Sequence, residues 1–233
     1  MRYLIGIGGL KRAGKDTFAR VLREVAVERG FAFVTVAFAD PLRQAAAAAY
    51  GVDVSAFTDD DKKDTVCPEW GITYRQMLIN LGEGMRSTDQ DHWVKRWRIE
   101  VDRQQTALVE EARSIGRHTA AIYSDRLVVA VPDVRRLNEA AAIHDAGGVN
   151  VLVQRPGVEW NGHVTELLAE TSREYGQRSY ADLSLFSELK QGTWHPADPR
   201  RDVFDAGIDN DGDVAALRPR AERVLDMVLK GAK

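Results

Sequence analysis

Residues 9–17 read GLKRAGKDT, and this stretch decides how the chain folds. It matches the phosphate-loop pattern G-x-x-x-x-G-K-S/T at Gly9, Gly14 and Lys15. An apolar run, MRYLIGI, precedes the loop as a buried strand would, and residues 16–30 carry apolar side chains at helical spacing. A loop between a strand and a helix points several backbone N–H groups at one place. The stretch therefore predicts a site for the phosphates of a nucleotide, against the alternative of an ordinary tight turn.

The loop departs from the pattern at one position. Asp16 stands where a Ser or Thr would follow the lysine, and the hydroxyl comes one residue later, at Thr17. One residue along a helix turns a side chain by about 100°, so the two positions are not equivalent. Thr17 can still reach Mg²⁺ directly or through water, and Asp16 either partners a nearby cation or stabilises the helix N-terminus. Lys11, Arg12 and Ala13 complete the expected nucleotide-binding loop.

The composition indicates a folded globular chain. Of its 233 residues, 44% are hydrophobic and 29% are charged, which is enough apolar material for a core. The formal net charge of −3 argues against a protein that mainly coats nucleic acid, although a local basic cleft stays open. The single cysteine, Cys67, excludes an internal disulfide and a multi-cysteine zinc site. No secretion signal or membrane-length apolar stretch is visible, so we expect a cytoplasmic protein without a membrane partner.

Five apolar runs predict the strands of a sheet. They lie at residues 1–7, 31–38, 126–131, 149–153 and 202–208. Several are apolar throughout rather than alternating, as in parallel strands that are covered on both faces. Helical patterns separate them, so we expect an α/β fold with a doubly wound, five-stranded parallel sheet and ligands at the carboxyl ends of the strands. The run DNDGD at residues 209–213 lacks the glutamate that closes a calcium loop, and we expect a turn there.

Two segments interrupt the alternation of strands and helices. Residues 41–124 form a mostly helical insert, and residues 154–201 are either a lid over the site or a surface insertion. We therefore expect a single domain, residues 1–233, that carries both insertions. In the insert, Trp93 and Trp97 alternate with basic residues. This pattern fits either the binding of a nucleic-acid strand or, as we favour, a buried helix stripe with solvated charges.

Candidate catalytic residues follow the second and third predicted strands, where this fold places its chemistry. Asp40 either caps the helix that Pro41 begins, or faces a transferred phosphoryl group while Arg43 clamps an acceptor phosphate. We favour the second interpretation. Asp133 ends the third strand as a natural carboxylate for Mg²⁺ and its waters. Arg135 either faces the phosphates or pairs with Asp133.

Other candidates lie in the insert and after the third and fourth strands. Glu139 occupies an early helix position, where it either orders Arg135 and contacts substrate or caps the helix. Arg155, after the fourth strand, is a candidate cation that neutralises charge during transfer. The insert supplies an aromatic ring, an amide and two arginines, which can stack on a base and bind a base edge and a phosphate. These are Tyr74, Arg75, Gln76 and Arg86.

Eight short stretches carry a resemblance to a known family. They read KRAGKDT (residues 11–17), ADPLR (39–43), YRQML (74–78), LGEGMR (81–86), DVRRLNEA (133–140), GGVNVLVQRPG (147–157), HVTE (163–166) and IDNDG (208–212). In this order they resemble the motifs of the bacteriophage-type deoxynucleoside monophosphate kinases, a group of P-loop kinases, and they span most of the chain. Monophosphate kinases commonly place the loop hydroxyl one residue late, as at Thr17.

This resemblance implies a P-loop NTPase fold and a kinase that transfers the γ-phosphate of ATP to a deoxynucleoside monophosphate, with Mg²⁺. It implies Lys15 on the β- and γ-phosphates, with Thr17 and Asp133 near the metal. The implied acceptor residues are Arg43, Arg75, Gln76 and Arg86. The partner would be a small nucleotide in the cytoplasm, that of the host cell if the chain is phage-encoded. The oligomeric state is left open, with a homodimer as one alternative.

Two other functions stay open. A related P-loop kinase would act on another acceptor, either dephospho-coenzyme A or a hydroxymethylated base in DNA. The DNA acceptor would be bound through the stripe that contains Trp93 and Trp97. A nucleotide-binding switch or ATPase would transfer nothing, and the clustered arginines of the insert argue against it.

Overall fold

The structure, a computed structural model, describes residues 2–159 and 203–231. Most of the predicted lid-like segment and the HVTE motif lie outside these residues. The chain divides into two compact units. The sheet unit comprises Met1–Thr35 and Gln104–Lys233, and the helical unit comprises Val36–Arg103. The helical unit therefore covers only the first part of the predicted insert, and the rest of the insert belongs to the sheet unit.

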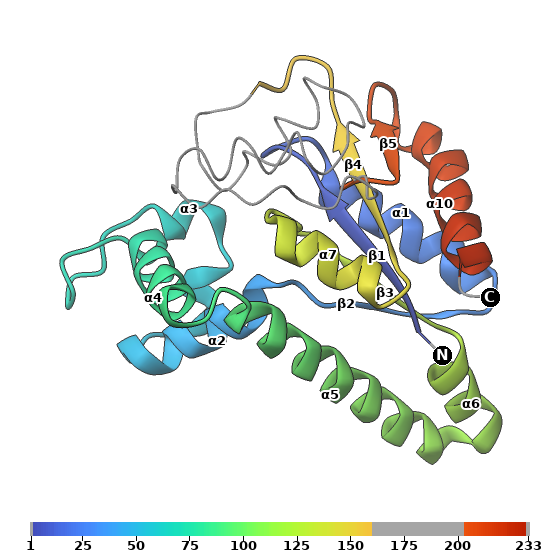
Figure 1. The fold of residues 1–233 in the computed structure, drawn as a ribbon, viewed down its shortest axis with the longest axis horizontal. Coiled ribbons are helices and arrows are strands. Elements are labelled where there is room, and N and C mark those ends of the chain that lie inside the picture. The colour runs from blue at the N-terminus through green and yellow to red at the C-terminus, as the bar shows by residue number, and fades with distance from the viewer. Residues whose placement is uncertain (1, 160–202, 232–233) are drawn as a thin grey trace. The chain divides into compact units, whose positions relative to one another are not determined.

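Five strands form the sheet of the sheet unit. They are β1 (Arg2–Gly8), β2 (Ala32–Thr35), β3 (Leu127–Val131), β4 (Val149–Gln154) and β5 (Ala206–Asp209). Their order is β2-β3-β1-β4-β5, and every neighbouring pair is parallel. This confirms the predicted α/β P-loop NTPase fold with its five-stranded parallel sheet. Because β1 is the central strand, the loop that follows it begins at the middle of the sheet's carboxyl edge (Figure 1).

Helices cover both faces of this sheet (Figure 1). On one face lie α1 (Lys15–Glu28) and α10 (Arg218–Gly231), and on the other lies α7 (Leu137–Asp145). The short helix η3 (Val214–Leu217) leads into α10, and α6 (Arg117–Asp125) contacts β3. Side chains of a strand alternate between its faces, so each strand must be apolar on both. This explains the continuous apolar runs of the sequence.

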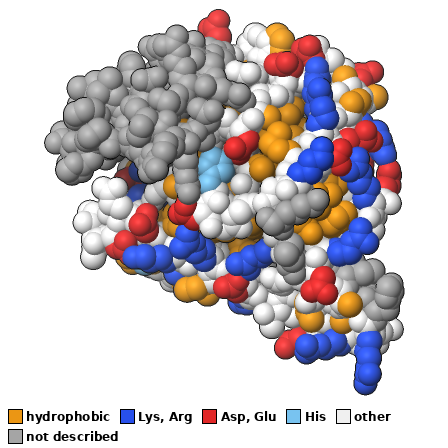
Figure 2. Space-filling view, turned by 45° about the vertical axis from the view of Figure 1, so that its right-hand side comes forward, with side chains coloured by type: hydrophobic (Ala, Val, Ile, Leu, Met, Phe, Trp, Pro, Cys, Tyr) orange, Lys and Arg blue, Asp and Glu red, His pale blue; other side chains and the backbone are white. Residues whose placement is uncertain are grey.

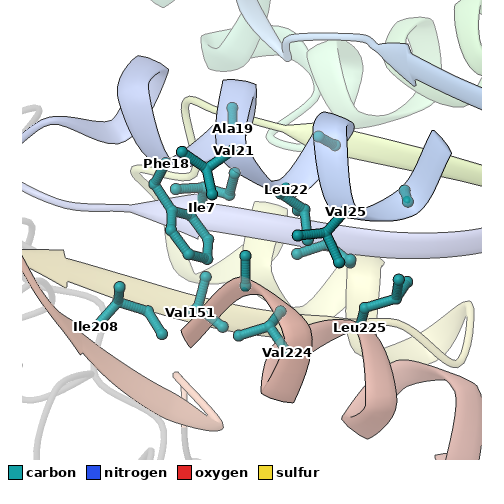
Figure 3. Close-up of a cluster of buried hydrophobic side chains, with 14 of the residues drawn as sticks. Ile7, Phe18, Ala19, Val21, Leu22, Val25, Val151, Ile208, Val224 and Leu225 are labelled. Carbon is teal, nitrogen blue, oxygen red and sulfur yellow. The ribbon is translucent and has the colours of Figure 1, made fainter. Parts of the chain in front are cut away.

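The main core lies between the sheet and the helix pair α1 and α10 (Figure 3). In α1, Phe18, Leu22 and Val25 repeat at helical spacing and are fully buried. Val224 and Leu225 of α10 complete the layer. Full burial of each such side chain stabilises the fold by about 1.5–3 kcal/mol relative to exposure. The helix that begins at the end of the phosphate loop is therefore anchored along its length.

Within the helical unit, four helical segments pack around a small core of their own. The segments are α2 (Ala39–Tyr50), η1 (Val54–Phe57), α3 (Asp60–Lys63) and α4 (Tyr74–Thr88), and α5 (His92–Ile115) contributes its first part. The core residues are Ala46, Phe57, Cys67 and Met77. No helix in the described ranges is both long enough and apolar enough to cross a membrane.

The two tryptophans of α5 belong to the interior of the helical unit. Trp93 is 3% exposed and Trp97 is 2% exposed. Their indole N–H groups donate to the carbonyl oxygens of Gly82 at 3.1 Å and of Val36 at 3.0 Å. Buried indole rings with satisfied N–H groups act as packing residues. The interpretation of these rings as a buried helix stripe is therefore confirmed.

The second strand is shorter than predicted, and the prediction of a strand through residue 38 was wrong. β2 ends at Thr35. The carbonyl of Val36 accepts the hydrogen bond from Trp97, and the ring of Phe38 lies on the ring of Trp97 with centroids 4.5 Å apart. A continuous apolar run shows that its residues are buried but does not show in which of two cores.

Candidate functional site

Two glycines shape the loop between β1 and α1. Gly9 and Gly14 have positive φ angles of 147° and 95°, which L side chains rarely adopt. A Cβ added to Gly9 would lie 2.5 Å from the carbonyl oxygen of Val153. A Cβ added to Gly14 would lie 2.2 Å from Nδ2 of Asn210. Both positions therefore require glycine for their backbone conformation and for space, which explains the spacing in GLKRAGKDT.

Lys15 is the first residue of α1, directly after the left-handed Gly14. Its Nζ donates hydrogen bonds of 2.8 Å each to the carbonyl oxygens of Gly9 and Leu10. The side chain therefore folds back over the loop. The ammonium charge and the first N–H groups of α1 both favour an anion at this helix end.

The remaining loop residues differ in their surroundings. Ala13 is buried, and its N–H donates to the carbonyl of Leu10 at 3.2 Å. Lys11 and Arg12 are exposed, and Arg12 is the one non-glycine residue in the described ranges with a positive φ, 68°. A left-handed conformation costs such a residue about 1–2 kcal/mol. Asp16 is exposed in the first turn of α1, and the next residue, Thr17, is half-buried.

The segment after β3 runs beside the end of β1. In the pairing of these strands, Val131 lies opposite Gly6, and the N–H of Val134 donates to the carbonyl of Ile7 at 3.3 Å. Asp133 is the residue before this hydrogen bond and is half-buried. The topology therefore brings Asp133 to the edge of the sheet where the phosphate loop begins, as expected for strands that are parallel neighbours.

Glu139 is 5% exposed in the first turn of α7. Its Oε2 accepts hydrogen bonds from the backbone N–H groups of Arg135 at 2.8 Å and Arg136 at 3.0 Å. Of the alternatives open for Glu139, the structure shows the ordering and capping role. The buried carboxylate, predicted above to contact substrate, is engaged with the backbone that carries Arg135.

Arg155 follows β4 and is exposed. It forms part of the wall of a small pocket that also includes Leu10 and Ala13 of the phosphate loop. The other lining residues are Leu152, Val153, Gln154 and Val158. The structure therefore places Arg155 next to the loop, within the sheet unit.

The predicted metal ligands are a hydroxyl and a carboxylate, Thr17 and Asp133. Mg²⁺ takes oxygen ligands and usually needs only one or two carboxylates, because it keeps waters and binds substrate phosphates. The chemistry of this pair fits that ion. Among the described residues there is no group of three or more His, Cys, Asp and Glu side chains that could form a separate metal site.

In the helical unit, Asp40 and Arg43 lie one turn apart on α2. Arg43 NH1 donates to Asp40 Oδ1 at 2.7 Å, and the N–H of Ala37 donates to Asp40 Oδ2 at 2.8 Å. α2 begins at Ala39, so Pro41 lies inside the first turn rather than opening the helix. The alternative in which Asp40 caps a helix that starts at Pro41 was therefore wrong. Arg43 Nε is buried and has no hydrogen-bond partner among the described residues.

The other predicted acceptor residues lie on α4. Two arginines bind carboxylates: Arg75 donates Nε and NH2 to both oxygens of Asp64 at 2.6 and 3.1 Å, and Arg86 donates to Glu83 at 2.8 Å. Gln76 and Tyr74 complete the set. Gln76 Nε2 donates to Asn80 Oδ1 at 2.7 Å. The ring of Tyr74 meets Phe57 edge-on with centroids 5.9 Å apart.

The hydroxyl of Tyr74 interacts with the thiol of Cys67. A hydrogen bond with the Cys67 thiol is the main cause that raises the pKa of Tyr74, and partial burial and the nearby Glu69 charge act in the same direction. The phenol therefore stays neutral at physiological pH. A neutral ring with a polar tip suits contact with a base.

Asn210 is a contact residue of the loop that the sequence analysis missed. It follows β5 in the DNDGD turn, and its Nδ2 donates to the carbonyl of Ala13 at 2.8 Å. The turn itself lies where it was expected. Its position at the carboxyl edge of a parallel sheet was the available signal, because side chains at that edge surround the ligand in this fold.

No protein-family profile matches the chain. A protein of Acanthamoeba polyphaga mimivirus named "Putative deoxynucleotide monophosphate kinase" is 28% identical over 181 residues, which are 74% of this chain and 84% of that relative.

Solved structures that align with nearly the whole chain have a lower sequence identity to it. A dephospho-CoA kinase from Campylobacter jejuni covers 97% of each chain at 12% identity, with a TM-score of 0.37. The APS kinase of Mycobacterium tuberculosis covers 98% of this chain and 97% of its own at 13% identity, with a TM-score of 0.35.

The viral relative is named for the family that the motifs resemble, so this resemblance is confirmed. The parallel sheet, the glycine-shaped loop and Lys15 at the start of α1 supply the corresponding fold. The chain thus has the P-loop NTPase fold and is similar in sequence to a viral protein that is named as a deoxynucleotide monophosphate kinase.

Proposed function

We propose that this kinase transfers the γ-phosphate of ATP to a deoxynucleoside monophosphate, giving ADP and the diphosphate. The observation that carries the proposal is the phosphate loop, in which Gly9 and Gly14 adopt positive φ angles and Lys15 begins α1. The name of the viral relative supports this class of acceptor.

The donor residues belong to the sheet unit. The backbone of the loop and Lys15 bind the β- and γ-phosphates, because N–H groups and an ammonium charge converge at one helix end. Thr17 and Asp133 hold Mg²⁺, which compensates phosphate charge when it is bound. Arg135, whose backbone is held by Glu139, and Arg155 supply further positive charge to the transferred group.

The acceptor residues belong to the helical unit. Arg43 is the principal acceptor residue, because its Nε is a buried donor without a partner among the described residues. Asp40 holds the other side of the guanidinium. A planar guanidinium binds phosphate through two parallel hydrogen bonds. Arg75, Arg86, Gln76 and Tyr74 would surround the rest of the nucleotide.

The chemistry asked of these groups is positioning and charge neutralisation. Phosphoryl transfer passes through a loose transition state with charge on the equatorial oxygens, so the protein need not form a covalent bond. Cations such as Lys15 and Arg135 are therefore the groups whose loss should reduce the rate most.

A panel of monophosphates tests this function. Deoxy- and ribonucleoside monophosphates and dephospho-coenzyme A are each incubated with ATP and Mg²⁺, and the products are separated by chromatography. Lys15→Ala should abolish transfer while it leaves the circular dichroism spectrum and the Tm unchanged. Lys230→Ala removes an exposed lysine of α10 and is the matched control. Deoxynucleoside diphosphate made at the parent rate by Lys15→Ala would contradict the assignment of the site.

The structure weakens the alternative of a base in DNA as acceptor. Trp93 and Trp97 are buried, so their rings are not available to stack on bases. Figure 2 shows acidic and basic side chains interspersed over the described part of one face. The alternative of a switch or ATPase is tested in the same panel, because it predicts equal ATP consumption with and without a monophosphate.

A further inference from the structure

The turn after β5 reaches the second half of the phosphate loop through one side chain. Asn210 Nδ2 donates a 2.8 Å hydrogen bond to the carbonyl oxygen of Ala13. The same nitrogen would be only 2.2 Å from a Cβ on Gly14. The amide of Asn210 therefore occupies the space that the missing side chain of Gly14 leaves open.

Asn210 itself is held on both sides. Its backbone N–H donates to the carbonyl of Gln154 at 2.7 Å, next to the pairing of β4 with β5. The following residue, Asp211, accepts a 3.0 Å hydrogen bond from Arg220 of α10. Asp213 then caps η3 by accepting from the N–H of Ala216 at 3.0 Å. The turn is thus tied to the sheet and to α10, which makes it a firm support for the loop.

The hydrogen bond fixes the direction of a backbone donor. In a planar trans peptide, the C=O of Ala13 and the N–H of Gly14 point in opposite directions. Holding the carbonyl against Asn210 therefore turns the N–H of Gly14 away from the β5 turn. That N–H comes directly before Lys15, among the groups that a phosphate loop presents to its ligand.

We propose that Asn210 is a positioning residue for the donor nucleotide: its amide holds the Ala13–Gly14 peptide so that the Gly14 N–H faces the triphosphate. This inference rests on the proposed function, since it needs the loop to bind ATP. An asparagine suits the role because it is a neutral donor that fits beside a glycine. An aspartate of the same shape would place a second acceptor against the carbonyl and a negative charge near the phosphates.

Three variants test the role of Asn210. Asn210→Ala removes the donor, Asn210→Asp keeps the shape and removes the donor, and Val214→Ala changes an exposed residue of the same segment as a control. The dissociation constant of a non-hydrolysable ATP analogue with Mg²⁺ should rise about fivefold in Asn210→Ala and more than about tenfold in Asn210→Asp. The KM for the monophosphate should stay at the parent value, and the Tm should fall only slightly, because one partly buried hydrogen bond is lost. In Val214→Ala all three quantities should stay at the parent values.

Hydrogen exchange supplies a readout that needs no nucleotide. The amides of residues 10–17 should exchange faster in Asn210→Ala than in the parent, while those of α10 exchange at the parent rate. If the parent bound no adenine nucleotide, the proposed function would fail, and exchange alone would still test whether Asn210 holds the loop. Parent-like analogue affinity together with parent-like exchange in Asn210→Ala would overturn the inference. Similar losses of affinity for the ATP analogue and for the monophosphate, together with a large fall in Tm, would also overturn it, because they indicate a general structural role.

Discussion

The guanidinium of Arg43 lies 2.7 Å from the carboxylate of Asp40, one turn away on α2. The second oxygen of this carboxylate accepts the N–H of Ala37, so Asp40 links the helix start to the arginine. Nε of Arg43 remains a buried donor without a partner among the described residues. The pair thus holds a guanidinium in place with part of its hydrogen-bonding capacity unused, which is the state expected of a phosphate-binding arginine.

Replacement of this arginine should affect the acceptor and spare the donor. Arg43→Lys keeps the charge but loses the planar fork, so the KM for the monophosphate should rise by about tenfold. The dissociation constant of the ATP analogue should stay at the parent value. Arg20→Lys, at an exposed arginine of α1, is the control. A parent-like KM in Arg43→Lys would remove Arg43 from the acceptor site.

Loss of the buried carboxylate after β3 should reduce both stability and rate. Glu139→Ala leaves the N–H groups of Arg135 and Arg136 without their acceptor, which should cost about 1–3 kcal/mol of unfolding free energy. Urea denaturation measures this loss. The kcat should fall as well, because the backbone that carries Arg135 loses its support. Glu139→Gln should lose less, since its carbonyl oxygen can still accept one bond, and an equal loss in the two variants would contradict this account.

The indole of Trp97 should act through packing alone. Trp97→Phe keeps an aromatic ring but removes the donor to the carbonyl of Val36, and unfolding free energy should fall by about 1–3 kcal/mol. Thermal unfolding measures the change. Affinity for single-stranded DNA should stay as weak as in the parent at low salt. A large loss of DNA binding in this variant would restore the alternative of a DNA acceptor.

The ion pair between Glu28 of α1 and Arg218 of α10 should make stability depend on acid pH. The hydrogen bond from Arg218, and secondarily its charge, lower the pKa of Glu28 from its usual 4.5. A lowered folded-state pKa means that the contribution is present above about pH 4.5 and is lost as the pH falls through the lower value.

Glu28→Gln should therefore have a lower Tm than the parent at pH 7, and the two Tm values should converge as the pH falls to about 3. The pair is exposed to solvent, so the difference should be small and should shrink in high salt. Glu110→Gln, at an exposed glutamate of α5, should match the parent across the range. A Tm difference that widened in acid would show that folding does not lower the pKa of Glu28.

Much of the proposed donor site could be recognised in the sequence because its signals are local. Gly9, Gly14 and Lys15 lie close together in the sequence, at the two ends of one loop, and the strand before the loop and the helix after it have clear periodicity. Asp133 could be placed because adjacent parallel strands bring their carboxyl ends to one edge. The contact of Asn210 could not be predicted, because it joins Asn210 to Ala13, 197 positions away. The DNDGD turn contains no pattern that indicates this partner.

The sequence by itself determined the parallel sheet, the phosphate loop and the group of kinases that the chain resembles, because periodicity and short motifs follow from local geometry. Only the tertiary structure decided that Val36 and Phe38 contact Trp97 instead of extending the second strand. It decided that the carboxylate of Glu139 is buried and accepts hydrogen bonds from the backbone. It also decided that Asn210 supports the loop. These outcomes depend on which buried surface or backbone group meets a side chain after folding, and that partner lies far away in the chain or in a different element.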